Sequence, residues 1–362
     1  GTKEAIDAVA KMVGNKPEVD VVQAQFGDGR TLDELMQYDT NPLSKFVFVG
    51  DPFQLPPVGE TESPALNEHS FDPPAQSGTL TQIMRQTEGN DIIGISKAIR
   101  VLAQKAPDDE SYYYTNNWTR LPLAGSPNIQ LHPTIEDMMS DYVARVKQDG
   151  YKHNVFICKT NKQNSTISTN VRRQLGYYSS IPEKGELLLV IQNNTISNLV
   201  NGDMVEVVSV DSRIRKVAGL GMIRIKVREL VSGKVFEQFM IVEPLWSNAN
   251  LNKDQQSRLF LDFFYRMKEK KIKRGTEEFK RMMFNDEYLN ALRCNYGYSV
   301  TCHKAQGGEW KNVYIHVPRN IGLNPTKSTY QWIYTALTRA TANVHMVNDT
   351  LYIGKRGMSI PQ

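Results

Sequence analysis

An alternation of apolar strand runs and amphipathic helices, interrupted once, is the feature that most constrains how this chain can fold. Residues 45–49 and 154–158 carry short uninterrupted apolar runs, which are typical of strands buried in a parallel sheet. Helical spacing of apolar residues and capping signals predict helices between such strands. The alternation predicts an α/β fold. The expected helices cover residues 91–104, 134–150, 161–175 and 328–340, and further strands are expected at 296–300, 312–317 and 343–347.

The interruption begins at Gly185, where the pattern changes to short β-rich runs separated by Asn, Gly and Asp turns. Residues 201–203 (Asn-Gly-Asp) and 232–234 (Ser-Gly-Lys) are typical of hairpin turns. We expect a small β-barrel at residues 184–245, inserted into the second α/β unit, followed by a charged helical segment at 250–285. The runs themselves are residues 187–191, 204–210, 221–227 and 235–242.

Positive charge is concentrated in one part of the chain. The net charge of the whole chain is +4. Residues 266–282 hold eight Lys and Arg against three Glu, a local net charge of +5. Such a segment suits contacts with a phosphate backbone. An ordinary solvated helical face is the alternative, and charge alone does not separate the two.

The three cysteines, Cys158, Cys294 and Cys302, are scattered and form no CxxC pair. We expect buried, reduced thiols in a cytoplasmic protein, without disulfides. No cluster of His and Cys lies at ligand spacing, so no metal site is predicted in the chain itself. No apolar run approaches the roughly 18 residues of a membrane span, and the sequence shows no charged-then-apolar leader. A membrane is therefore not an expected partner.

The first polar motif follows the apolar run at 45–49. It reads Gly50-Asp51-Pro52-Phe53-Gln54-Leu55-Pro56-Pro57-Val58. A carboxylate at a strand end can lie near a metal-bound phosphate, and a glutamine shortly after it can reach a terminal phosphate or its attacking water. A strand exit with a Pro-rich turn is the structural alternative.

Three further segments carry candidate chemistry. Leu80 to Gln86 contains Arg85, a residue type that stabilises charge on a transferring phosphoryl group. Residues 300–310 read Val-Thr-Cys-His-Lys-Ala-Gln-Gly-Gly-Glu-Trp, in which a strand ends at Thr301 and glycines allow close approach of a ligand. Residues 334–340 read Tyr-Thr-Ala-Leu-Thr-Arg-Ala on an expected amphipathic helix. Considered alone, each segment has a plain structural interpretation. Arg85 could be a surface arginine, His303 a structural histidine, and the helix that carries Arg339 an ordinary amphipathic helix.

Together, in this order and spacing, the four motifs resemble those of superfamily 1 DNA helicases of the RecD/Dda type, which include the exodeoxyribonuclease V alpha-subunit-like ATP-binding proteins. The resemblance covers residues 20–350 and is most specific at 50–58, 301–307 and 334–339. It implies two RecA-like domains, the first one incomplete here, with an inserted SH3-like barrel. A plain structural insertion is the alternative for the barrel.

The resemblance also implies which residues contact the nucleotide. Gln54, Arg85 and Arg339 are the implied catalytic residues, with Arg85 as a sensor of the γ-phosphate and Arg339 as the arginine finger. ATP and Mg²⁺ are the implied cofactors of the full-length protein. The implied nucleotide contacts are Gly50, Asp51, Gln54, Arg85, Gln306, Gly307, Glu309 and Arg339.

Single-stranded DNA is the implied partner. The resemblance assigns polar contacts with its backbone to two loops that follow strands, and further contacts to the Pro-rich loop after the first motif. A nuclease or a replication and repair protein is a further implied partner, because RecD-type motors act inside nuclease complexes. The chain itself shows no carboxylate cluster for nuclease chemistry. The implied strand contacts are Pro57, Thr160, Asn161, Thr301, His303 and Lys304.

A working motor also needs Gly-x-x-x-x-Gly-Lys-Ser/Thr and an Asp-Glu pair, and neither is present in the 362 residues. Residues 6–13 resemble the Asp-Glu motif faintly, with Ala8 in the place of the glutamate, and suit an amphipathic helix better. Residues 26–35 resemble a family stretch that precedes the Gly50 motif. We therefore expect either a fragment or a degenerate helicase, and negligible ATP hydrolysis by this chain alone.

These observations predict four regions and one function. The resemblance implies that the function is ATP-dependent movement along single-stranded DNA as a helicase or translocase, and closeness to the RecD/Dda branch implies the 5′-to-3′ direction. The alternative is a catalytically inactive nucleic-acid-binding or interaction module that keeps the fold. The regions are a partial first RecA-like domain at 1–105, a linker at 106–132, a second RecA-like domain at 133–183 plus 286–362, and the barrel with the basic helical segment at 184–285.

Overall fold

The computed structural model describes two compact units. It describes residues 46–71, 74, 76–78, 90–106, 126–317 and 326–347. Unit 1 holds the described residues before position 130 together with residues 326–342, and unit 2 holds residues 130–317 and 343–347. Each unit is described here by itself.

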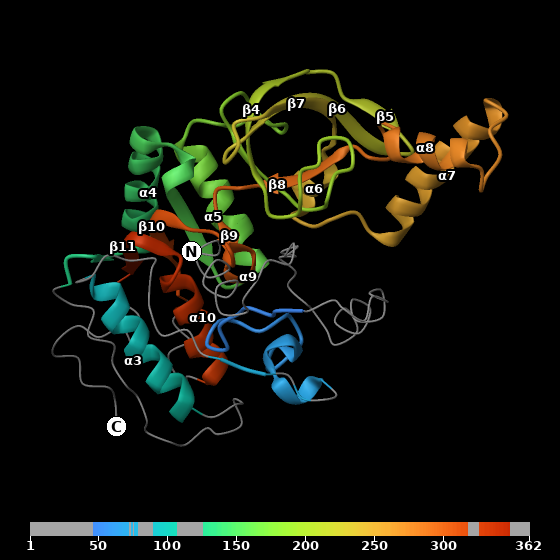
Figure 1. The fold of residues 1–362 in the computed structure, drawn as a ribbon. Coiled ribbons are helices and arrows are strands. Elements are labelled where there is room, and N and C mark those ends of the chain that lie inside the picture. The colour runs from blue at the N-terminus through green and yellow to red at the C-terminus, as the bar shows by residue number, and fades with distance from the viewer. Residues whose placement is uncertain are drawn as a thin grey trace. The chain divides into compact units, whose positions relative to one another are not determined.

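A five-stranded sheet with the order β1-β11-β10-β2-β9 underlies the α/β part of unit 2 (Figure 1). Strand β2 runs parallel to both β10 and β9, and Cys158 at the end of β2 lies opposite Thr301 at the end of β9. The carboxyl ends of these two parallel strands therefore meet at one edge of the sheet. The strands are β1 (Ile129–His132), β2 (Asn154–Cys158), β9 (Val300–Thr301), β10 (Trp310–Ile315) and β11 (Ala340–Val347).

Helices α4 (Ile135–Asp149) and α5 (Asn161–Gln174) pack on one face of this sheet through a common apolar cluster. Thr134 caps α4 by accepting a hydrogen bond from Asp137 N, and Gly150 ends it with a positive φ of 75°. These caps agree with the predicted bounds of the helix. The cluster contains Met138, Tyr142, Val146, Phe156, Ile167, Val171 and Tyr314.

A closed β-barrel forms the second part of unit 2. Its sheet has the order β4-β3-β8-β7-β6-β5, and an additional pairing between β4 and β6 closes a ring of five strands. The barrel core is aliphatic and includes Leu188, Val205, Ile223 and Met240. The strands are β3 (Leu187–Val190), β4 (Met204–Val210), β5 (Arg215–Val217), β6 (Leu220–Glu229), β7 (Val235–Ile241) and β8 (Leu292–Tyr296).

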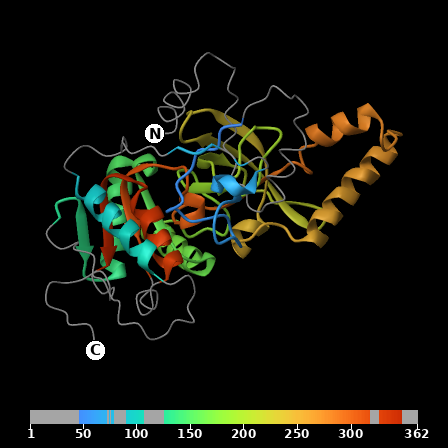
Figure 2. The ribbon, with the colours of Figure 1, turned by 60° about the horizontal axis from the view of Figure 1, so that its bottom comes forward.

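Between β7 and β8 the chain forms the short helix α6 (Glu243–Ser247) and then a pair of helices, α7 (Lys253–Glu269) and α8 (Glu277–Asn285). Figures 1 and 2 show α7 and α8 as an arm that extends away from the barrel. Phe263, Met267 and Phe279 form the core of this arm. Arg266 joins the two helices, since its guanidinium bonds both carboxylate oxygens of Asp286. The arm is the predicted basic helical segment.

In unit 1, helix α3 (Asp91–Lys105) packs against helix α10 (Lys327–Leu337). Asn90 caps α3 by accepting a hydrogen bond from Ile92 N, and Thr326 forms a capping box at the start of α10. The predicted helices at 91–104 and 328–340 are therefore present, the second one three residues shorter at its C-terminus. The sequence placed α10 in the domain that also holds β10, whereas in the structure its residues belong to unit 1.

Three sequence-based expectations were wrong. The described residues of the predicted strand at 45–49 form no strand, and Phe46, Val47 and Val49 are exposed. An apolar run becomes a strand only when its backbone groups pair with a neighbour, and none of the described strands pairs with residues 46–49. The predicted linker at 106–132 ends in β1, a strand of the main sheet.

The third error concerns residues 296–300, which were predicted as one strand. Only residues 297–299 lie between two strands, because β8 ends at Tyr296 and β9 begins at Val300. Strand β8 closes the barrel, although the predicted boundary at residue 286 assigned it to the neighbouring domain.

The described cysteines agree with expectation, since Cys158, Cys294 and Cys302 are buried free thiols. Among the helices in the described part of the chain, none combines the length and apolar character needed to cross a membrane.

Candidate functional site

Four of the predicted strand-binding residues flank one edge of the main sheet. Thr160 and Asn161 follow the end of β2 and begin α5, while Thr301 ends β9 and His303 follows in α9 (Cys302–Ala305). The parallel register of β2 and β9 brings the two loops side by side at the sheet edge. Lys304, the fifth of these residues, lies in the same short helix.

A capping box holds the first of these loops. The hydroxyl of Thr160 accepts a hydrogen bond from Gln163 N at 3.2 Å, and Gln163 Oε1 accepts one from Thr160 N at 3.1 Å. Thr160 and Asn161 remain exposed. The first N–H groups of a helix have no partner within it and favour an anion, so this end of α5 suits a phosphate.

A buried polar network fixes α5 against the second loop. Ser299 Oγ lies 2.5 Å from Asn164 Oδ1 and 3.1 Å from Asn164 O, so its hydroxyl can donate to either oxygen. Ser168 Oγ lies 3.2 Å from the same Ser299 oxygen. All three side chains are buried, and a satisfied buried network holds its members in one geometry. The relative positions of the two loops are therefore set by groups beneath the surface.

The side chains of the second loop are partly desolvated. Thr301 is buried, and His303 and Lys304 are half-buried. Burial lowers the pKa of the His303 imidazole and that of the Lys304 ammonium. A neutral imidazole can donate one hydrogen bond and accept another, while a half-buried ammonium interacts more strongly with an approaching phosphate than a fully hydrated one does.

The loop continues through the predicted nucleotide contacts Gln306, Gly307 and Glu309. Gln306 ends α9, Gly307 has a φ of +83°, and Gly307 and Glu309 are exposed. Gly308 is required sterically, because a Cβ built there would lie 2.1 Å from the ring of Trp310. The loop therefore turns at Gly307 and passes close to the Trp310 ring at Gly308.

Within unit 1, three hydrogen bonds connect the Gly50 motif to helix α10. Tyr334 OH donates to Asp51 Oδ2 at 2.6 Å, Leu55 N donates to Thr335 Oγ1 at 2.8 Å, and Gln331 Nε2 donates to Pro52 O at 3.1 Å. Burial and the hydrogen bond to Asp51 both raise the pKa of the Tyr334 hydroxyl, which stays protonated and donating. Two motifs about 280 residues apart in sequence thus share one hydrogen-bonded surface.

Asp51, a predicted nucleotide contact, is engaged on both carboxylate oxygens. Oδ2 accepts from Tyr334, and Oδ1 accepts from Phe53 N at 3.0 Å. Gln54, the predicted catalytic glutamine, is half-buried in the same turn, and its N–H donates to Asp51 O at 3.0 Å. Gly50 precedes this turn and Pro57 follows it, where Pro57 O accepts from Glu60 N.

Arg339, the predicted arginine finger, follows α10 and is 1% exposed. Its Nε donates to Thr335 O at 3.1 Å and its Nη2 donates to Thr338 Oγ1 at 3.2 Å. In this conformation the guanidinium caps the end of its own helix. Arg85, the other predicted catalytic arginine, lies outside the described residues, as do the segments 6–13 and 26–35.

A cluster that the sequence did not predict brings together His132, Asp141 and His345. Their possible ligand atoms all lie within 4.8 Å of one another. His132 Nε2 is 3.0 Å from His345 Nδ1, and Asp141 Oδ2 accepts from Tyr314 OH at 2.5 Å and from Arg145 Nε at 3.2 Å. Spacing could not reveal the cluster, because His132 and His345 lie 213 positions apart.

This cluster is a partly buried hydrogen-bonded network. Burial lowers the pKa of His345 to about 3, so its imidazole is neutral and its 3.4 Å contact with Asp141 is not an ion pair. The two ring nitrogens already face each other at hydrogen-bond distance, and the guanidinium of Arg145 beside the carboxylate opposes a second cation. The geometry therefore favours a structural role for these three side chains.

Comparison with protein families identifies the region that holds the second sheet-edge loop, the one at Thr301. The family model of the UvrD-like helicase C-terminal domain matches residues 296–347. This range runs from the end of β8 through β11 and contains Thr301, His303, Lys304 and Arg339. The chain is also 24% identical over 373 residues to the uncharacterized protein R530 of Acanthamoeba polyphaga mimivirus, with 86% of this chain and 70% of that protein covered.

Several solved structures are similar in outline. Bacteroides Pif1 bound to ssDNA has a TM-score of 0.44 at 16% identity, with 92% of this chain and 68% of that chain covered. Pif1 helicase from Candida albicans has a TM-score of 0.35 at 14% identity, with 83% and 63% covered. The chain spans only 62% of the length of the Pif1 chain solved at forked dsDNA. The match at residues 296–347 supports a superfamily 1 helicase relationship for the part of the chain that carries the Thr301 and Arg339 motifs.

Proposed function

We propose that this chain is part of an ATP-dependent helicase or translocase that moves on single-stranded DNA. One observation carries the proposal: Thr160, Asn161, Thr301, His303 and Lys304 flank a single sheet edge, and three of them lie in the span that matches a helicase C-terminal domain. Motion in the 5′-to-3′ direction, a RecD/Dda-type relationship and an SH3-like identity of the barrel are parts of the same proposal, on the resemblance of the sequence motifs.

The sheet edge suits a sugar-phosphate backbone for physical reasons. The start of α5 offers unpaired N–H groups, and Lys304 adds a positive charge that water screens only in part. Contacts of this kind read the backbone and not the bases, so we expect weak sequence preference and strong dependence on salt.

The nucleotide side of the proposal rests on the resemblance of the motifs that contain Asp51, Gln54, Arg339 and residues 306–309. ATP with Mg²⁺ would supply the free energy of movement in the full-length protein. The residue types fit a nucleotide, but Asp51 is bonded to Tyr334 and Arg339 caps its own helix. Both side chains would have to exchange these partners before contacting a phosphate.

That engagement favours a second candidate function, a strand-binding module without turnover. The two candidates share the sheet edge and differ only in the nucleotide side. ATP hydrolysis by the full-length protein, stimulated by single-stranded DNA, separates them, since only the helicase proposal expects it.

Salt-dependent binding tests the sheet edge directly. The variant Lys304→Met keeps the apolar stem of the side chain and removes its charge. The matched control is Lys234→Met, which removes an exposed lysine from the turn between β6 and β7. Binding of a labelled oligothymidylate is measured by fluorescence anisotropy from about 50 to about 200 mM salt.

We expect Lys304→Met to reduce the slope of log K against log salt by about 0.7, the contribution of one phosphate contact on a single strand. Lys234→Met should leave the slope unchanged. Equal slopes for both variants and the unmodified chain would remove Lys304 from the interface, and with it the main charge of the proposed site.

A further inference from the structure

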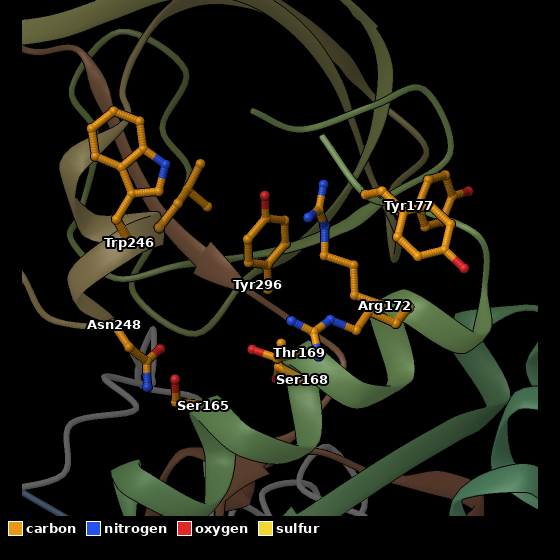
Figure 3. A pocket seen from close by; sticks show the side chains of 11 residues that line it. Ser165, Ser168, Thr169, Arg172, Tyr177, Trp246, Asn248 and Tyr296 are labelled. Atoms are coloured by element: carbon orange, nitrogen blue, oxygen red, sulfur yellow. The ribbon is translucent and has the colours of Figure 1, made fainter. Parts of the chain in front are cut away.

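A pocket opens between α5 and α6 inside unit 2. Its volume is about 290 Å³, at the small end of the range for ligand sites. Figure 3 shows Ser165, Ser168 and Thr169 along α5, with Trp246 and Tyr177 on opposite sides and Tyr296 between them. None of the residues that line the pocket is a carboxylate.

One aromatic side chain of this pocket, that of Trp246, is both exposed and held in place. Trp246 is 56% exposed, yet its Nε1 donates to Ser180 O at 2.8 Å, which fixes the indole with part of its surface open. Tyr178, which also lines the pocket, is 76% exposed. An exposed large aromatic whose orientation is fixed suits stacking with another flat ring, because little entropy is lost on contact.

The two arginines of the pocket have different roles. Arg172 is committed, since its Nε and Nη2 donate to the buried carboxylate of Glu186 at 2.6 and 2.9 Å and its guanidinium lies over the Tyr296 ring. Arg173 is exposed, and none of the ion pairs of the described residues includes it. The pocket thus combines a fixed wall with one positive charge that can meet an anion.

A polar stripe on α5 leads from the sheet edge to this pocket. Asn161, Ser165, Thr169 and Arg173 recur at intervals of four residues, so they lie along one helix face, and all four are exposed. The stripe spans about 18 Å at 1.5 Å per residue. Asn248, which lines the pocket, donates to Asn161 O at 3.1 Å and so connects the two ends.

We propose that the pocket is a subsite for one base of the single strand that the sheet edge binds, with the base stacked on Trp246 and an adjacent phosphate near Arg173. This inference rests on the proposed strand-binding function and extends it to the far end of α5. A free mononucleotide has the same chemistry, so the test must separate it from a base within a strand.

The first experiment leaves the protein unchanged. A single abasic position is moved along an oligothymidylate of about 12 nucleotides, and the affinity of the chain is measured for each oligonucleotide. We expect one position to lower the affinity about 5- to 100-fold, as the loss of one stacked base would. A uniform small effect at every position would overturn the subsite.

The second experiment assigns that position to the pocket. In Trp246→Ala the sensitivity to the abasic position should vanish, and in Trp246→Phe most of it should return. Tyr265→Ala is the matched control, because Tyr265 is 58% exposed but lies on α7 and does not line the pocket. Sensitivity that persists in Trp246→Ala, or disappears in Tyr265→Ala, contradicts the assignment.

Two further arms separate the possible failures. Lys304→Met should weaken binding of every oligonucleotide without changing which position is sensitive. If Lys304→Met has no effect, the proposed function fails at the sheet edge. If it weakens binding while no position is sensitive, only the pocket assignment fails. Thymidine monophosphate that binds as tightly as the oligonucleotide would overturn the strand subsite in favour of a free-nucleotide site.

Discussion

We expect the ion pair between Arg172 and Glu186, on the α5 side of the pocket, to contribute strongly to the free energy of unfolding. Glu186 is fully buried and accepts hydrogen bonds from Arg172 at 2.6 and 2.9 Å, from Tyr298 OH at 2.9 Å and from Glu183 N at 2.8 Å. Glu186→Gln keeps the shape but leaves the largely buried guanidinium without its counter-charge. Removing one partner of a buried pair costs about 3–5 kcal/mol of unfolding free energy.

The matched control is the same substitution in an exposed pair. Glu237 lies 3.1 Å from Arg224, and their side chains are 52% and 44% exposed. Glu237→Gln should cost at most about 1 kcal/mol, because water screens the pair. Urea titration of both variants, followed by circular dichroism and linear extrapolation, gives the two differences in free energy. The reasoning fails if Glu186→Gln costs no more than Glu237→Gln.

Three other predictions follow from single contacts. Arg339→Ala in the full-length protein should lower ATP hydrolysis by about 10³-fold or more while sparing most single-strand affinity; hydrolysis that survives in the folded variant would contradict the arginine-finger role. Gly308→Ala should destabilise the chain by about 1–3 kcal/mol in a urea titration, since the added Cβ meets the Trp310 ring at 2.1 Å; an unchanged midpoint would show that the loop yields freely. The third concerns His345, whose pKa burial lowers from 6.5 to about 3. The unfolded chain binds this proton below about pH 6.5 and the folded chain does not, so stability is full above pH 6.5 and falls as the pH drops toward 3. The decline in melting temperature between about pH 7 and pH 5 should be smaller in His345→Gln, and equal declines would refute the assignment.

Most of unit 2 was predictable because its signals are local. The caps Thr134, Thr160 and Gly150 mark helix ends within the turn they close, and alternating apolar residues mark the barrel strands β4 and β6. The strand β8 was missed for the converse reason. Its Arg293 and Asn295 are buried polar residues, so the apolar pattern that predicts a strand is broken although the backbone is paired on both sides.

The candidate sites also differ in whether local sequence signals could predict them. The loops at Thr160 and Thr301 follow strands whose parallel pairing places them at one edge, and the sequence motifs marked both. The pocket at Trp246 depends instead on the packing of α5 near α6, about 70 residues apart in sequence. No periodicity in the sequence predicts that packing. The engagement of Asp51 by Tyr334 was equally hidden, since each residue was assigned to a different domain.

Amide hydrogen exchange on addition of an oligothymidylate of about 12 nucleotides tests the central claim most directly. Residues 159–165 and 301–306 flank the proposed sheet edge, and residues 268–274 at the end of the basic arm provide the internal comparison. We predict that protection rises at 159–165 and 301–306 and fades as salt is raised. Protection confined to residues 268–274, or absent from both loops, would contradict the claim that this sheet edge binds the strand.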